Sequence, residues 1–321
     1  MTAMEKQMTR VSVAQVGSIA FDPAATAEKA VAIVAEAAEA GSRLLLFPEA
    51  FLGTYPKALL FRSPIGRRTE QARAEFERYL AGAVELDGPE VARVAEAAAE
   101  HGVFVVLGIV ERAGRTLYCT AVLISDTGEI VGHHRKVMPT GTERLIWGFG
   151  DGSTLPVVES PAGRVGAVIC WENYMPLLRT AMYAQGIAVY CAPTADDRDS
   201  WLPTMTHVAL EGRCHVLSAC QVMRRSDYPD DYDADFGTEP DAILMRGGSV
   251  IVSPRGEIIA GPLYDEEGML TADIDPAEVA RMSFDFDVTG HYARPDIFSL
   301  HVDTGRKEPV RFGTAPGTTG S

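Results

Sequence analysis

The chain has 321 residues, 46% of them hydrophobic, which is enough to bury a large core in one domain or two closely joined halves. Its net charge of −15 argues against nucleic acid or an anionic membrane as the main partner. Five cysteines, an odd number without a C-x-x-C pair, indicate reduced thiols and a cytoplasmic protein.

The first half of the chain alternates between strand and helix signals. Residues 11–16 (VSVAQV) alternate like a strand, and the Ala-rich residues 23–40 predict a helix that ends before Gly41. The run RLLLFPEA at 43–50 is apolar almost throughout, which indicates a strand buried on both faces. No apolar run approaches the roughly 20 residues of a membrane span, and the polar start lacks the apolar centre of a signal peptide.

A second helix and two similar hairpins complete the predicted fold. The helix covers residues 89–101, with Pro89 at its start, and the strand VFVVLGIVE follows it. The hairpins lie at 121–132 and 249–262, and in each the second arm opens on Glu-Ile after a turn that contains Gly. These signals predict an α/β protein with two internally similar halves, in which two sheets face each other and helices cover them.

Two segments lie outside this periodic pattern. Residues 227–241 carry seven carboxylates and no Lys or Arg, which favours a solvated acidic loop over a surface that binds cations. Residues 301–321 lose periodicity and end in Gly, Thr, Pro and Ser. We therefore expect one domain over residues 1–300 and a C-terminal tail over 301–321, either flexible or an arm at an interface.

Cys170 stands out among the five cysteines because it ends the apolar run VGAVIC and precedes a predicted helix that begins at Pro176. A cysteine near a helix N-terminus is expected to favour its thiolate, and a strand-to-helix junction presents a nucleophile at the edge of a sheet. The alternative is a packed core thiol, which is the expectation for Cys119, Cys191 and Cys220.

A thiol nucleophile needs a base, and Glu49 is a better candidate than any of the seven histidines. It follows LLLFP, so its carboxylate would emerge from a buried strand, where desolvation raises a carboxyl pKa. Lys136 follows the first hairpin in HHRK, and Glu143 lies close enough in the sequence to pair with it. A structural Glu and a solvated basic patch are the alternatives for Glu49 and Lys136.

Taken together, LLLFPEAFLGTYPK, HHRKVMPT and GAVICWENYMP resemble, in this order, the nitrilase superfamily of carbon–nitrogen hydrolases. The resemblance extends through TGTERLIWGFGDGST and APTADDRDSW to about Leu300, and CWEN is similar to true nitrilases, closest to those of plants and their bacterial relatives. It implies a four-layer αββα sandwich and a Glu49, Lys136 and Cys170 site without metal or cofactor. It also implies Glu143 as a second glutamate, and a homodimer or larger homo-oligomer that can form spirals.

The implied reaction is hydrolysis of a small-molecule nitrile by water through a thioimidate and a thioester on Cys170. Trp171 and Glu172 are expected to shape the pocket beside the nucleophile. The candidates for its apolar wall and substrate contacts are Trp171, Tyr55, Trp147, Tyr174 and Thr140. Core packing is the alternative for the aromatic residues. Arylacetonitriles, aliphatic nitriles, cyanoalanine and cyanide stay open as substrates.

Three alternatives to complete nitrile hydrolysis remain. An aliphatic amidase or carbamoylase would use the same residues on an amide. A nitrilase would release some amide if sulfur left the tetrahedral intermediate before ammonia. A catalytically silent assembly protein would keep the sandwich without the chemistry, although the presence of Glu49, Lys136, Glu143 and Cys170 argues against it.

Overall fold

The computed structural model describes residues 8–62, 64–307 and 310. Two sheets form the centre of the molecule. The first has the order β12-β1-β2-β3-β4-β5. Its strands are β1 (Thr9–Gln15), β2 (Leu44–Leu46), β3 (Phe104–Ala113), β4 (Thr116–Ile124), β5 (Ile130–Arg135) and β12 (Gly268–Ile274). Strands β1, β2 and β3 are parallel, and the others pair antiparallel.

The second sheet has the order β11-β10-β8-β7-β6, and β9 pairs with β10. Its strands are β6 (Val165–Ala167), β7 (Val189–Thr194), β8 (His215–Cys220), β9 (Val222–Arg224), β10 (Ile243–Val252) and β11 (Ile258–Tyr264). Strands β6, β7 and β8 are parallel. Because the parallel strands of α/β sheets present binding residues at their carboxyl ends, functional side chains are expected at the ends of β2, β6 and β7.

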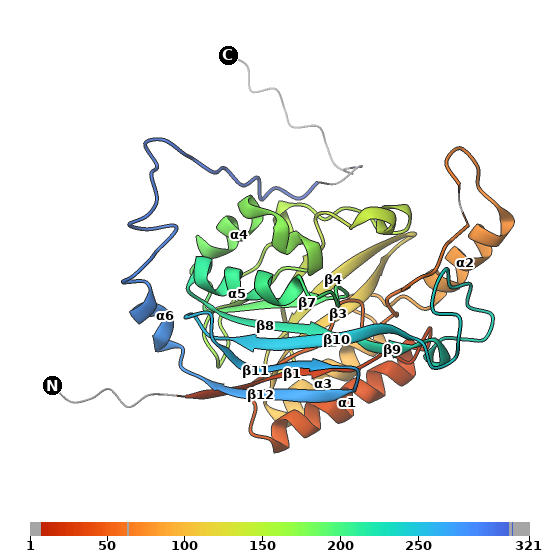
Figure 1. Ribbon diagram of the computed structural model, residues 1–321, viewed down its shortest axis with the longest axis horizontal. Helices are drawn as coiled ribbons and strands as arrows, with labels where there is room; N and C mark the ends of the chain where they lie inside the picture. The colour runs from red at the N-terminus through yellow and green to blue at the C-terminus, as the bar shows by residue number, and fades with distance from the viewer. Residues whose placement is uncertain (1–7, 63, 308–309, 311–321) are drawn as a thin grey trace, which may run out of the picture.

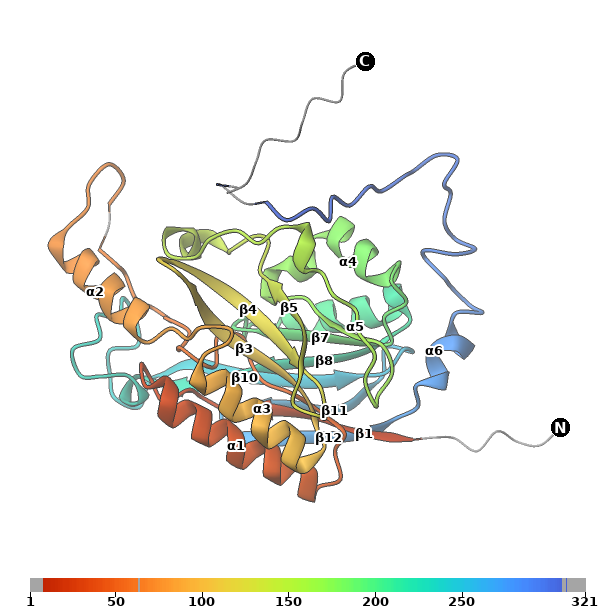
Figure 2. The ribbon, with the colours of Figure 1, turned by 180° about the vertical axis from the view of Figure 1, so that it is seen from behind.

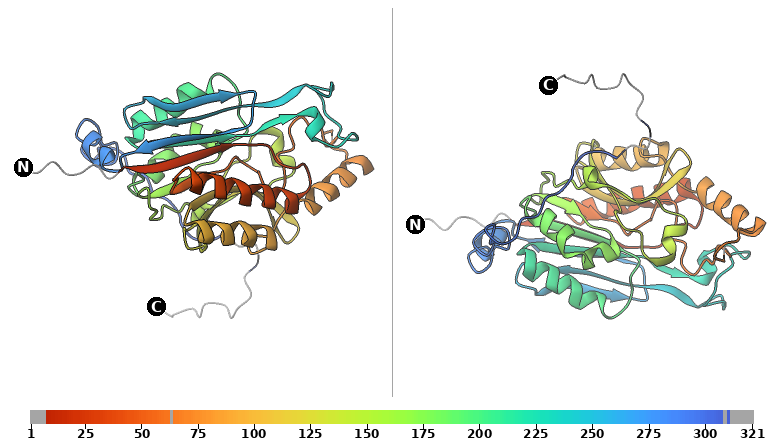
Figure 3. Two further views of the ribbon diagram at one scale, coloured as in Figure 1. Left: turned by 90° about the horizontal axis from the view of Figure 1, so that it is seen from below. Right: turned by 90° about the horizontal axis from the view of Figure 1, so that it is seen from above.

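The helices lie outside the sheets and make a four-layer αββα sandwich (Figures 1 and 3). Helices α1 (Pro23–Glu39) and α3 (Pro89–His101) cover the first sheet, and α4 (Pro176–Tyr183) and α5 (Trp201–Gly212) cover the second. Successive side chains of a strand point to opposite faces of the sheet, so neighbouring residues pack in different layers. Leu44 and Leu46 pack between the sheets with Leu217, whereas Leu45 faces the helices. The predicted fold class is therefore confirmed.

The two predicted hairpins have the same turn. In each, a serine N–H donates to the carbonyl of a glutamate four residues later: Ser125 to Glu129 at 2.8 Å, and Ser253 to Glu257 at 2.8 Å. The glycines of the two turns, Gly128 and Gly256, have φ angles of +82° and +78°, which favour glycine. This repeated local structure is the basis of the predicted similarity between the two halves.

The acidic segment 227–241 packs beside α2 (Glu70–Ala81) at one end of the molecule (Figure 2). Arg78 of α2 contacts Asp231 at 2.9 Å, and Arg62 binds Asp233. Tyr228 and Tyr232 are buried, and their hydroxyls donate to the backbone carbonyls of Tyr55 and Lys57. The segment therefore differs from a simple solvated loop, since it holds residues 55–57 in place.

The chain leaves the sandwich after α6 (Ala277–Met282) and continues without helix or strand through residues 283–307, passing over α4 (Figure 1). Most of the predicted tail lies outside the described residues. Its described part contacts the body where the N–H of Lys307 donates to Asp151 at 2.7 Å. Within the described ranges, none of the helices combines the length and apolar character needed to cross a membrane.

Candidate active site

Glu49 lies just beyond β2, with its side chain 1% exposed between the two sheets. The next residue, Ala50, has a φ of +51°, an uncommon conformation for a residue with a Cβ. The side chain of Gln221, beyond the end of β8, donates to the backbone carbonyl of Glu49 at 2.9 Å. Both sheets therefore contribute to the position of this carboxylate.

Lys136 follows β5 and is fully buried between two carboxylates. Its Nζ atom lies 2.7 Å from Oε1 of Glu49 and 2.8 Å from Oε2 of Glu143. Burial opposes the charge of Lys136, but the Glu49 carboxylate raises the pKa of this ammonium well above its usual value. A fixed positive charge is thus present deep in the protein.

Glu143 belongs to the short helix η1 (Gly141–Leu145) and makes further hydrogen bonds. The hydroxyl of Tyr55 donates to Oε1 at 2.7 Å, and the N–H of Thr140 donates to Oε2 at 2.6 Å. Each oxygen of this carboxylate therefore has a donor, and Lys136 supplies a second donor to Oε2.

The two carboxylate oxygens of Glu49 have different surroundings. Oε1 accepts from Lys136 and from the thiol of Cys119, whose Sγ lies 3.4 Å away. Oε2 is buried and has no hydrogen-bond partner among the described residues. Burial raises the pKa of Glu49, while the nearby Lys136 ammonium lowers it, and the net direction is upward. Oε2 is therefore a buried acceptor available to a proton.

Cys170 follows β6 and is 4% exposed. Its φ of +52° places it in the left-handed region, where a non-glycine residue is strained. Thr194, the last residue of β7, donates its hydroxyl to Sγ at 3.2 Å. The strand-to-helix junction predicted from the sequence is present, but the short helix η3 (Cys170–Tyr174) separates Cys170 from α4.

The expectation that a helix N-terminus favours the Cys170 thiolate is wrong. Burial, followed by the Glu49 carboxylate, raises the pKa of this thiol above its ordinary value, and the Lys136 ammonium offsets this only in part. Cys170 is therefore a protonated thiol at neutral pH, and its activation requires a base.

A cavity of about 250 Å³ opens beside Cys170. Of the predicted site residues, its lining contains Cys170, Glu143, Tyr55, Thr140 and Trp171. The indole N–H of Trp171 donates to Asp196 at 2.8 Å, which fixes the ring at the cavity mouth. Glu49 and Lys136 are not part of this lining. Lys136 binds Glu143, which lines the cavity, and it also binds Glu49.

The other two predicted wall residues lie elsewhere. Trp147 is 2% exposed, donates to the Tyr79 hydroxyl at 3.2 Å, and has its ring centroid 5.5 Å from Nζ of Lys136. It packs in the core behind the ammonium. Tyr174 is 42% exposed and packs edge-on against Trp171, with its hydroxyl bonded to Thr204.

Several residues around the cavity were missed by the sequence analysis. Lys57, Asp196, Asp197 and Arg198 line it, and Arg198 stacks over Trp171 with its Cζ 4.7 Å from the ring centroid. APTADDRDSW already contains three of them, directly after a strand, which was a usable signal for loop residues at a sheet edge. Cys119 packs in the core between the sheets, as expected, and its thiol also donates to Glu49.

Glu172, expected to shape the pocket, is 1% exposed and binds backbone N–H groups and His134 instead. A polar contact network, rather than a substrate surface, surrounds its carboxylate.

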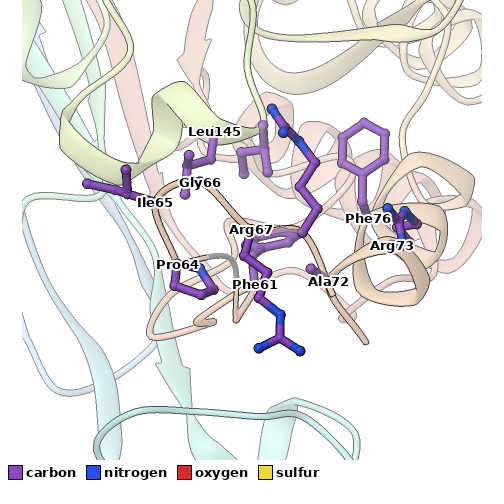
Figure 4. A pocket seen from close by; sticks show the side chains of 11 residues that line it. Phe61, Pro64, Ile65, Gly66, Arg67, Ala72, Arg73, Phe76 and Leu145 are labelled. Atoms are coloured by element: carbon purple, nitrogen blue, oxygen red, sulfur yellow. The ribbon is translucent and has the colours of Figure 1, made fainter. Parts of the chain in front are cut away.

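A different cavity, of about 450 Å³, lies between α2 and η1 (Figure 4). Phe76 and Arg73 reach it from α2, and Leu145 reaches it from the helix that carries Glu143. None of the predicted site residues lines it. In the described part of the chain, no group of three or more His, Cys, Asp or Glu side chains is arranged to hold a metal ion.

Comparison with known proteins identifies the family of the chain. The profile of the carbon–nitrogen hydrolase family matches residues 10–284. The chain is 55% identical over 301 residues to the aliphatic nitrilase of Sinorhizobium fredii (strain HH103), covering 94% of this chain and 97% of that protein. It is 53% identical over 307 residues to the bifunctional nitrilase/nitrile hydratase NIT4B of Nicotiana tabacum, covering 94% and 88%.

The fold is similar to that of a solved structure. The crystal structure of a carbon–nitrogen hydrolase from Helicobacter pylori G27 superposes with a TM-score of 0.72 at 18% identity, covering 92% of this chain and 98% of that one. The sequence profile and the relatives agree, and the chain belongs to the carbon–nitrogen hydrolase family.

Proposed function

We propose that the protein is a nitrilase that hydrolyses an organic nitrile to the carboxylic acid and ammonia, with Cys170 as nucleophile. The observation that carries the proposal is the buried contact of Glu49, Lys136 and Glu143 beside the cavity that contains Cys170. The relatives named nitrilases, 53–55% identical over nearly the whole chain, support nitrile rather than amide as the substrate.

In the first half of the reaction, Sγ of Cys170 forms a bond with the nitrile carbon while one carbon–nitrogen π bond breaks. The thiol proton passes to the unpartnered Oε2 of Glu49 and from there to the nitrile nitrogen, which gives a neutral thioimidate. A base is needed because the pKa of Cys170 is raised by burial.

In the second half, Glu49 takes a proton from water while the water oxygen attacks the thioimidate carbon and the carbon–nitrogen π bond breaks. Glu49 passes this proton to nitrogen, which gives a neutral tetrahedral intermediate with one hydroxyl and one amino group. The remaining carbon–nitrogen bond then breaks as the hydroxyl proton is transferred to nitrogen through Glu49, which releases ammonia and leaves a thioester on Cys170. A second water hydrolyses this thioester and releases the acid and the thiol.

Lys136 stabilises the negative charge that develops at the reacting centre, and a preorganised donor of this kind contributes roughly 3–4 kcal/mol. Glu143 orients Lys136 through the 2.8 Å contact. Tyr55, Thr140 and Trp171, which line the cavity, contact the substrate, whereas Trp147 and Tyr174 support the site from behind and from outside.

Partial amide release is a second product route. If the carbon–sulfur bond of the tetrahedral intermediate breaks before the carbon–nitrogen bond, the product is the amide and Cys170 is regenerated directly. The Nicotiana tabacum relative is named for both activities, which supports this route here.

The test is a panel of phenylacetonitrile, an aliphatic nitrile, β-cyanoalanine, cyanide and the corresponding amides, scored for acid, amide and ammonia. We expect acid and ammonia from at least one nitrile, no turnover by Cys170→Ala, and a covalent adduct on Cys170 by intact-protein mass spectrometry. Cys191→Ala, at a buried cysteine in the core between the sheets, is the matched control. Turnover of amides alone would make the enzyme an amidase, and ammonia release by Cys170→Ala would refute the nucleophile.

We also propose that the chain forms a homodimer or larger homo-oligomer in the cytoplasm. Exposed apolar side chains support assembly, among them Leu177 of α4, 68% exposed, and Phe284 and Phe298 of the C-terminal segment. Five free, buried cysteines support a reducing compartment. Light scattering at several concentrations and cell fractionation test these two points. A monomer at all concentrations would contradict the first, and recovery outside the cytoplasm would contradict the second.

A further inference from the structure

The carboxylate of Glu172 connects the segments that carry Lys136 and Cys170. Its Oε1 accepts from the N–H of Val137, the residue after Lys136, at 2.6 Å. Its Oε2 accepts from the N–H of Ile169, the residue before Cys170, at 2.9 Å. The buried Glu172 side chain thus accepts a backbone N–H from the residue next to Lys136 and from the residue next to Cys170, and we assign both Lys136 and Cys170 a role in the reaction.

His134 completes this arrangement from β5. It is 0% exposed, its Nε2 lies 2.8 Å from Oε2 of Glu172, and its Nδ1 lies 2.6 Å from the carbonyl oxygen of Thr154. A carbonyl oxygen only accepts, so Nδ1 carries a hydrogen. The contact with Glu172 then needs a second proton, either on Nε2 or on the carboxyl group.

The backbone contacts decide where that proton lies. Both oxygens of Glu172 already accept a backbone N–H, which favours the arrangement in which Nε2 of His134 carries the proton and donates to Oε2. Burial and the Lys136 ammonium oppose the resulting imidazolium charge, and His133 is a further titratable neighbour. The Glu172 carboxylate and the Thr154 carbonyl nevertheless raise the pKa of His134 above its ordinary value.

The backbone at Cys170 needs such support. Its φ of +52° is held by hydrogen bonds on either side, because Asn173 donates its amide to the carbonyl oxygens of Val168 and Cys170 at 3.0 and 2.7 Å. Glu172 extends this local network to Val137, the neighbour of Lys136.

We propose that His134 and Glu172 form a positioning pair: the His134 imidazolium donates to Glu172 and holds its carboxyl group in place, and Glu172 sets the separation between Lys136 and Cys170. The inference rests on the proposed roles of those two residues. Neither member of the pair needs to touch the substrate. A displacement of about 1 Å between reacting groups can cost about 100-fold in rate, so a fixed separation matters for the chemical step.

The first test examines the enzyme without substrate. NMR of protein labelled with ¹⁵N-histidine, with His134→Gln to assign the signal, reports the protonation of each ring nitrogen. We expect both nitrogens of His134 to carry protons at about pH 8, where ordinary histidine is neutral. One bare nitrogen at that pH would overturn the proposal, and this measurement does not depend on the folding of Glu172 variants.

The second test separates the chemical step from binding. Glu172→Gln replaces an acceptor oxygen with an N–H donor, so we expect kcat to fall about 100-fold while KM changes less than about threefold. For His134→Gln, which retains a donor but no charge, we expect a fall of about tenfold. The double variant should be no slower than Glu172→Gln, because the two residues act as one unit.

The matched control is His133→Gln, at the neighbouring position of the same strand, which should change kcat and KM by less than about twofold since its side chain points to the other face. Unchanged kcat in Glu172→Gln, or a rise in KM alone, would overturn the positioning role. Ammonia release by Cys170→Ala would instead refute the proposed nucleophile, whatever the protonation of His134, so the two failures are distinguishable.

Discussion

Lys136 and Glu49, 87 residues apart in the sequence, are joined by a 2.7 Å hydrogen bond between side chains that are both fully buried. The same ammonium binds Glu143, so one positive charge neutralises two carboxylates only in part. The remaining negative charge therefore favours binding of a proton by the cluster, and the unpartnered Oε2 of Glu49 can accept it.

Removal of the Lys136 charge should affect both stability and catalysis. Lys136→Met leaves two buried carboxylates without their counterion, so we expect the free energy of unfolding to fall by about 3–5 kcal/mol at neutral pH. We also expect kcat to fall at least about 100-fold. Chemical denaturation and ammonia release measure the two effects.

The free energy of unfolding of Lys136→Met should increase as the pH falls. Without the ammonium, burial and mutual repulsion raise the carboxyl pKa values in the folded state, so part of the lost stability returns as pH falls toward the ordinary carboxyl range. Lys29→Met, at a partly exposed ion pair with Glu267, is the control and should cost at most about 1 kcal/mol. Equal losses in the two variants would contradict the role of burial.

The fall of kcat/KM at acid pH (the acid limb) should reflect protonation of the Glu49 carboxylate. Because burial raises the pKa of this carboxyl and the proposed base must be ionised, kcat/KM should rise with pH through an apparent pKa above the ordinary Glu value of about 4.3. Initial rates from about pH 4 to 9 with a neutral nitrile measure this limb. An acid limb at or below the ordinary value would exclude Glu49 in its present environment as the base.

Cys170 should not be a thiolate in the resting enzyme, since burial raises its pKa. The ultraviolet absorbance of wild type minus Cys170→Ala should show no thiolate band near neutral pH, and one should appear only as pH rises into the alkaline range. A thiolate band at neutral pH would mean that Lys136 outweighs burial and Glu49.

Tyr55 should stabilise Glu143 through its 2.7 Å hydrogen bond. Tyr55→Phe leaves a buried carboxylate oxygen without this donor, so we expect a loss of about 1.5–3 kcal/mol in the free energy of unfolding. The matched control is Tyr292→Phe, at an exposed ring, for which we expect no measurable loss. Thermal and denaturant unfolding of both variants test the difference, and equal stability of both would remove the proposed contribution.

The Cys119 thiol should affect the pKa of the Glu49 carboxyl. Its thiol lowers the pKa of that carboxyl, so Cys119→Ala should move the acid limb of kcat/KM to higher pH without abolishing activity. Cys191→Ala removes the same atoms from a cysteine that packs between the sheets and should leave the limb in place. An identical shift in both variants would indicate a general loosening of the core instead.

Much of the fold was predictable because local rules govern it. The alternation of residues 11–16, the Pro and Gly boundaries of α1 and α3, and the two Gly-containing turns each act over a few residues. The resemblance of the three segments around Glu49, Lys136 and Cys170 was sufficient for the family, which the profile and the relatives confirm.

The site depended on contacts that local rules do not describe. Trp147 and Trp171 looked alike as wall residues, but packing buries the first behind Lys136 and leaves the second at the cavity mouth. The thiolate expected at Cys170 followed from a nearby helix, whereas burial and a facing carboxylate dominate its pKa. The sequence does not distinguish Cys119 from the other core thiols, but strand pairing within the first sheet places its Sγ 3.4 Å from Oε1 of Glu49.

The amino-acid order thus determines the strands, the helices and the kinds of reactive side chain at their ends, because backbone preferences and apolar periodicity act locally. Which side chains meet, which charges are shared and which atom is left to accept a proton depend on the tertiary structure. Strand pairing within the first sheet joins Glu49 and Lys136, 87 positions apart, and the second sheet carries Cys170. Distance and burial set these interactions, and both arise only when the whole chain is folded.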